Sequence, residues 1–170
     1  MSRRPALEPL VITKEHEWLN RFLGDWSYDQ MCPTGVGGEM FRLSGTEHVR
    51  SIGGVWIHGE GRATMPDGSP MTTINIVGYD TAKKQYVGAW TGSMMTHMFV
   101  YQGWVETDGR TLVLESIGPC MTDATKQRRY RDITEFVDDD HRAFRTEMLG
   151  DDGKWSKFMS MDMRRIRARG

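Results

Sequence analysis

The chain has 170 residues, of which 22 are basic and 23 acidic, so its net charge is −1. This length allows one domain with a single core, and the balanced charge excludes a global basic field that would attract nucleic acid or an anionic membrane. The two cysteines, Cys32 and Cys120, are far apart and lack metal-type spacing, which argues against a disulfide framework and against a metal site.

Residues 1–12 predict an extended arm, because Pro5 and Pro9 interrupt any regular element. The only apolar run here, Leu10–Ile12, is too short for the hydrophobic part of a secretory signal and for a membrane span. We therefore expect a cytoplasmic protein without membrane insertion, whose single domain covers residues 13–170.

A short amphipathic helix is expected directly after the arm. Thr13 is a favourable N-cap, and Gly24 is a favourable residue for ending the helix. Between them, apolar residues follow the spacing of one helix face: Trp18, Leu19, Phe22 and Leu23.

From Asp25 onward the pattern changes to alternation, which predicts β-strands. Turn clusters rich in Gly, Asp, Ser and Pro separate the strands at even spacing, which is typical of an antiparallel meander. Ten strands are expected, near residues 25–31, 39–51, 55–65, 70–79, 85–92, 96–106, 111–117, 127–137, 142–149 and 154–165. Because sheets of this size curl or close to remove their edges, the sequence predicts a mainly β fold, a ten-stranded antiparallel up-and-down barrel.

The last strand shows the clearest alternation, with Trp155, Met159, Met161 and Met163 on one face, which we expect to point inward. Membrane barrels also use long alternating strands. Charges within the strands, such as Arg131 and Asp132, argue against a membrane barrel here.

The segment Phe22–Trp26 joins the helix to the first strand, and its Gly-x-Trp is similar to the motif that opens lipocalin-like (calycin) barrels. More of the chain, including Gly53–Trp56, Gly78–Asp80 and Trp90–His97, resembles a widespread bacterial lipocalin-like family of unknown function. The resemblance covers about residues 14–165. It implies the fold, and it supplies no established activity, catalytic residue or cofactor.

The resemblance also implies how one end of the barrel closes. In calycin barrels the Trp closes one end, and an Arg from the last strand packs across the indole ring. Arg165 is in phase with Met163, so it is the inward-facing basic residue that would cover Trp26. Both residues are expected to stabilise the barrel rather than to contact a ligand.

Candidate ligand contacts are the aromatic and polar residues on faces that could point into the barrel. On the third strand only one face can do so: either the larger side chains Trp56 and His58, or the alternating set that contains Ile57 and Gly59. Glycines fill a core poorly, which favours the larger side chains as cavity residues. The candidate ligand-binding residues are Trp56, His58, Trp90, His97, Tyr101, Tyr130 and Met161.

His97 follows the turn at Gly92–Ser93, which would place it near a barrel mouth. It could act as a proton donor, as a haem ligand or as a hydrogen-bond anchor, although a lone histidine on an apolar strand is more often structural. The segments 35–38 and 119–126 are candidate loops over the mouth.

The leading hypothesis is therefore a barrel that binds an apolar or amphipathic small molecule, with no cofactor identified. The first alternative is an enzyme that uses a cavity histidine, His97 or His58, as acid or base with help from Glu60 or Glu115. The second is a haem-binding barrel. A homodimer is also conceivable, because barrels of this size can pair through exposed strands.

Overall fold

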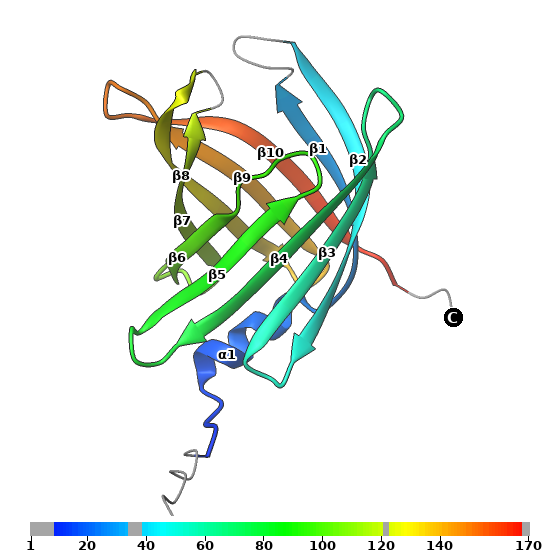
Figure 1. Ribbon diagram of the computed structural model, residues 1–170. Helices are drawn as coiled ribbons and strands as arrows, with labels where there is room; N and C mark the ends of the chain where they lie inside the picture. The colour runs from blue at the N-terminus through cyan, green and yellow to red at the C-terminus, as the bar shows by residue number, and fades with distance from the viewer. Residues whose placement is uncertain (1–8, 34–38, 121–122, 168–170) are drawn as a thin grey trace, which may run out of the picture.

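The computed structural model describes residues 9–33, 39–120 and 123–167 and shows a closed antiparallel barrel (Figure 1). The strands are β1 (Gly24–Pro33), β2 (Met40–Ile52), β3 (Trp56–Thr64), β4 (Pro70–Asp80), β5 (Gln85–Gly92), β6 (Phe99–Val105), β7 (Thr111–Cys120), β8 (Asp123–Asp138), β9 (His141–Leu149) and β10 (Trp155–Arg165). Each strand pairs with its neighbour in sequence, and β1 pairs with β10 to close the ring. The predicted ten-stranded up-and-down barrel is confirmed.

The helical segment covers one end of the barrel (Figure 1). It is shorter than predicted: α1 (Lys14–Trp18) passes into a 3₁₀ turn, η1 (Leu19–Phe22). The backbone N–H of Thr13 donates to His16 Nδ1 at 3.0 Å at the start of α1. Leu19 and Phe22 are buried against the barrel core, so this segment closes that end. No helix in the described part of the chain has the length and apolar composition needed to cross a membrane.

Trp26 lies at the closed end and is fully buried. Its Nε1 donates to Phe22 O at 2.8 Å, and two guanidinium groups lie over its ring, that of Arg165 at 4.3 Å from the ring centroid and that of Arg142 at 4.4 Å. Arg165 also donates to the carbonyl oxygens of Leu23, Arg21 and Asp139. The Arg165 side chain thus links the first and last strands to the helical segment.

The largest difference from the predicted strands lies between β7 and β8. We expected a loop over residues 119–126, whereas β7 extends to Cys120 and β8 begins at Asp123. The strands continue because Pro119 pairs with Gln127 and because the Tyr130 hydroxyl donates to Pro119 O at 2.7 Å. The other candidate loop, 35–38, lies outside the described residues.

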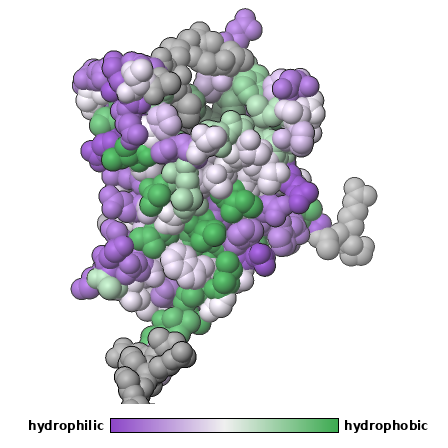
Figure 2. Space-filling model, viewed as in Figure 1, coloured by the Kyte–Doolittle hydropathy of each residue, from purple (hydrophilic) through white to green (hydrophobic). Residues whose placement is uncertain are grey.

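The outer surface of the barrel carries apolar side chains on the face formed by β3 to β6 (Figure 2). Ile76, Ala89 and Val100 are partners across three neighbouring strands, and Val100 is 63% exposed. Trp56 also points outward and covers Gly78, where a Cβ atom would lie 2.3 Å from the indole ring. The outward positions are therefore not uniformly polar, and hydropathy alone does not separate the two faces of these strands.

Candidate ligand-binding cavity

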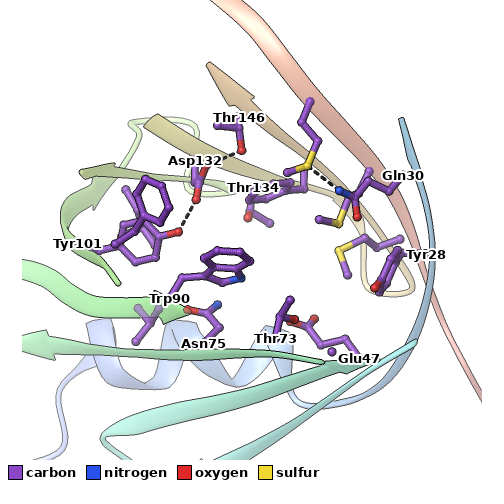
Figure 3. A pocket seen from close by; sticks show the side chains of 18 of the residues that line it. Tyr28, Gln30, Glu47, Thr73, Asn75, Trp90, Tyr101, Asp132, Thr134 and Thr146 are labelled. Atoms are coloured by element: carbon purple, nitrogen blue, oxygen red, sulfur yellow. Dashed lines mark hydrogen bonds between the residues drawn. The ribbon is translucent and has the colours of Figure 1, made fainter. Parts of the chain in front are cut away.

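A cavity of about 250 Å³ occupies the barrel interior, above the plugged end (Figure 3). It is enclosed by the inward positions of the strands, because alternate side chains of a strand point to the same face. Methionines and aromatic rings dominate its wall: Met71, Met94, Met95, Met159, Met161, Met163, Tyr28, Trp90, Phe99, Tyr101, Tyr130, Phe144 and Phe158. Thioethers are flexible and polarizable, so such a wall adapts to apolar ligands of varied shape.

One polar group of the cavity centres on Asp132, whose strand β8 also places Tyr130 and Thr134 in the wall. The Tyr101 hydroxyl donates to Asp132 Oδ2, and the Thr146 hydroxyl donates to Asp132 Oδ1 at 2.6 Å (Figure 3). Burial raises the pKa of the Asp132 carboxyl, and the two hydrogen bonds only partly oppose this rise. Burial also holds the pKa of Tyr101 well above its ordinary value, so Tyr101 remains a hydrogen-bond donor.

Two carboxamides form a second polar group of the cavity wall. Gln30 is 7% exposed, and its Nε2 contacts the sulfur atoms of Cys32 and Met159. Its Oε1 is buried and has no hydrogen-bond partner among the described residues, and the same holds for Oδ1 of Asn75. A buried acceptor without a partner costs about 1–3 kcal/mol, so both oxygen atoms favour a ligand that donates hydrogen bonds.

An ion pair lies at the closed end of the cavity, where Arg142 Nη2 donates to Glu47 Oε2. Arg142 is 4% exposed, and its guanidinium lies 4.9 Å from the Phe22 ring centroid. Tyr28 stands nearby, and burial followed by the negative charge of Glu47 raises the pKa of Tyr28 to about 12. This pair is neutral as a whole, so it adds no net charge to the cavity.

Residues 12–165 match the model of the family described as "Protein of unknown function (DUF1579)". The chain belongs to this family. The recognition of a barrel family of unknown function from the Gly-x-Trp segment and its accompanying motifs is thereby confirmed. No curated protein matches the chain.

Two solved structures have a barrel fold similar to that of this DUF1579 protein. Rv2717c from M. tuberculosis is 13% identical, with a TM-score of 0.60 over 92% of this chain and 100% of that chain. The S-type phycobiliprotein lyase CPES from Guillardia theta is 12% identical, with a TM-score of 0.55 over 95% of this chain and 100% of that chain. At such low identity the likeness shows the fold alone.

Four of the candidate residues line the cavity of the DUF1579 barrel: Trp90, Tyr101, Tyr130 and Met161. Their role as ligand contacts stays a prediction. His97 is not among the lining residues; its Nε2 lies 3.2 Å from Ile117 O, and its ring packs edge-on against Phe99, which does line the cavity. His97 is therefore placed beside the cavity wall rather than in it.

The interpretation that Trp56 and His58 face the interior is wrong. Ile57, Gly59 and Gly61 face inward, whereas Trp56 is 38% exposed and His58 lines an open groove on the outer surface. These two positions favour glycine because neighbouring side chains cover them. A Cβ atom on Gly59 would lie 2.9 Å from Glu47 Oε1, and one on Gly61 would lie 2.4 Å from Thr73 Oγ1. These glycines leave room for other side chains, so they do not mark an outward face.

Sequence reasoning did not select Asp132, Gln30, Asn75 or Arg142, which supply much of the polar chemistry of the cavity. A signal was present for Asp132, because it is in phase with the candidate Tyr130 on the same strand. No such signal marks Gln30, whose unpaired oxygen atom depends on contacts to sulfur atoms from two strands. The described residues contain no group of three or more His, Cys, Asp or Glu side chains that could hold a metal ion.

The raised pKa of Asp132 predicts how stability changes with pH. The folded state holds this proton more tightly than the unfolded state, so wild type loses stability as pH rises from about 4, the ordinary pKa of an aspartate, toward the folded-state pKa. Asp132→Asn cannot ionise and avoids this loss. The free energy of unfolding of Asp132→Asn minus that of wild type, measured by denaturant titration, is therefore expected to increase with pH.

Asp29→Asn supplies the control for this pH series. The hydrogen bond from Arg42 holds the pKa of exposed Asp29 below its ordinary value, so its relative stability is expected to change with pH in the opposite direction. The hydrogen-bond donors to Asp132 are Tyr101 and Thr146, and the other charged side chains of the described lining, Glu47 and Arg142, are paired with each other. A pH-independent difference between Asp132→Asn and wild type would contradict the assignment.

Proposed function

We propose that the barrel binds a small amphipathic molecule inside the cavity. The observation that carries the proposal is the lining itself, in which apolar thioethers and aromatic rings surround a few polar groups, two of them unpaired acceptors. Small-molecule sites in proteins combine a concave, mostly apolar wall with a few polar groups that orient the ligand. The plugged end, with buried Trp26, leaves the opposite mouth as the entry route.

The alternatives that depend on a cavity histidine receive no such support. No histidine is among the residues that line the cavity in the described part of the chain. His16 is buried elsewhere, with its Nε2 3.0 Å from Tyr79 O, and His141 pairs with Asp162. Glu60 and Glu115, which could have assisted a catalytic histidine, pair with arginines outside the cavity. The function that we propose is therefore ligand binding in which no histidine side chain of the protein takes part.

Isothermal titration calorimetry with tryptophol tests this proposal. Tryptophol is a neutral indole alcohol that can place its ring against the apolar wall and its hydroxyl against an unpaired acceptor. We expect one molecule to bind per chain, with a dissociation constant that is roughly micromolar. Ser116 is buried and lines the cavity, so Ser116→Phe is expected to fill the space and weaken binding about tenfold or more.

Ser27→Phe is the matched control, because Ser27 is exposed on the outer side of β1. It introduces the same ring without entering the cavity and is expected to leave tryptophol binding unchanged. Circular dichroism establishes that both variants keep the β-sheet signal of wild type. Equal binding by Ser116→Phe and wild type would place the ligand outside the cavity and overturn the proposal.

A further inference from the structure

The charges of the cavity do not balance. Among the described residues, three side chains that can carry a carboxylate or guanidinium charge line it: Glu47, Asp132 and Arg142. Arg142 already pairs with Glu47. Asp132 pairs with no basic side chain among the described residues, and its hydrogen bonds come from the neutral hydroxyls of Tyr101 and Thr146. The described part of the lining therefore holds one carboxyl group more than it holds cations.

The hydrogen bonds to Asp132 suit its ionised form, whereas its burial opposes ionisation. Tyr101 and Thr146 donate to different oxygen atoms of the carboxyl group, and two donors of this kind suit a carboxylate, which accepts at both oxygens. A carboxylate can accept about four hydrogen bonds, so lone pairs remain for a further donor. What the site lacks is a positive charge to offset the cost of burying the ionised form.

Two other acceptor groups of the cavity wall also lack a hydrogen-bond donor. Gln30 Oε1 and Asn75 Oδ1 are buried acceptors without a partner among the described residues, and Gln30 is more than nine-tenths buried. Figure 3 shows both carboxamides and the indole ring of Trp90 around the same space as Asp132. Indole faces attract cations through their quadrupole. The unpaired polar groups and the aromatic surface thus favour the same kind of ligand.

One buried hydrogen-bond donor, Nε of Arg142, also has no partner among the described residues, and by itself it would favour a ligand that accepts hydrogen bonds. Its guanidinium lies over the rings of Phe22 and Trp26 at the closed end, and its charge is matched by Glu47. An anionic ligand there would meet the negative charge of Glu47 at the same pair. The ion pair is therefore a poor anchor for an anion, whereas Asp132 has no competing charge.

We propose that the cavity selects a small organic cation, a protonated amine on an apolar or aromatic body, whose ammonium group pairs with Asp132. The inference rests on the proposed function, because it names the class of ligand for the same cavity. On binding, the ammonium donates to the free lone pairs of the Asp132 carboxylate, and the aromatic body lies against the thioether and ring wall. Any proton that Asp132 carries in the free protein passes to the solvent.

Three indole probes that differ in one terminal group test this selection by calorimetry at neutral pH. Tryptamine carries an ammonium group, tryptophol a hydroxyl group and indoleacetate a carboxylate group. We expect tryptamine to bind wild type at least about tenfold more tightly than tryptophol, and indoleacetate to bind most weakly. Equal binding of the amine and the alcohol, or tightest binding of the carboxylate, overturns the selection while leaving the proposed function intact. Failure of all three probes to bind overturns both.

The variant Asp132→Asn tests whether the Asp132 side chain causes the preference for tryptamine over tryptophol. Asparagine has nearly the same shape and no charge, so this variant is expected to lose the preference for tryptamine over tryptophol. Asp29→Asn removes an equal charge from the outer surface and is expected to keep the preference. A preference that survives in Asp132→Asn overturns the assignment, and the comparison of the three probes on wild type decides the selection even if the variant does not fold.

Discussion

Replacing Trp26 with alanine is expected to lower the free energy of unfolding by about 3–5 kcal/mol, the range for a large aromatic side chain removed from a core. Trp26 is fully buried, so the change leaves a void where β1 meets the helical segment. It also removes the hydrogen bond to Phe22 O and the ring beneath the Arg142 and Arg165 guanidinium groups. Guanidinium chloride denaturation followed by circular dichroism measures the loss.

Trp104→Ala is the matched control for this change. Trp104 is 44% exposed on β6, and its Nε1 donates to Glu106 Oε1 at 3.1 Å on the outer surface. Its removal is expected to cost about 1 kcal/mol or less, because it leaves no internal void. Losses of similar size for the two variants would contradict the role of Trp26 as the plug of the closed end.

The second large effect is expected at the buried ion pair. Arg142→Met leaves the Glu47 carboxylate without its partner in the barrel interior, and breaking such a pair on one side costs about 3–5 kcal/mol. Burial lowers the pKa of Arg142, and the negative charge of Glu47 opposes this change, so Glu47 stabilises the charged form of Arg142. Methionine keeps the apolar contact with Phe22 and Trp26, so the loss reports mainly the unpaired charge.

A double-mutant cycle with Glu47→Gln isolates this dependence. Removing both charges is expected to cost clearly less than the sum of the two single changes, because no unpaired charge remains in the double variant. Denaturant titrations of wild type, both single variants and the double variant supply the four free energies of unfolding. Simple additivity of the two single losses would show that the pair is not coupled.

Much of the fold follows from the sequence because its signals are local. The polar turns set the strand ends, alternation sets the faces, and the phase of Arg165 with Met163 places it against Trp26 across paired strands β1 and β10. The strand ends near Cys120 were predicted less well. There, pairing of Pro119 with Gln127 and the Tyr130 hydrogen bond override a loop-like composition.

The site was predicted only in part, because its polar chemistry depends on contacts between distant strands. Trp90 and Tyr101 could be assigned to the cavity from their own strand patterns. Trp56 could not be placed correctly, since its outward position depends on Gly78, which lies on the next strand and leaves space for the indole ring. Likewise, the chemistry of Asp132 comes from Tyr101 on β6 and Thr146 on β9, far from it in sequence.

A crystal structure of the protein grown with tryptophol tests most directly whether the interior of the barrel is a binding site. Electron density for the indole ring is expected inside the barrel, in contact with Trp90, Tyr101 and Met161. The tryptophol hydroxyl is expected within hydrogen-bond distance of Gln30 Oε1 or Asn75 Oδ1. Tryptophol found only on the outer surface, with the interior free of ligand density, would contradict binding inside the barrel.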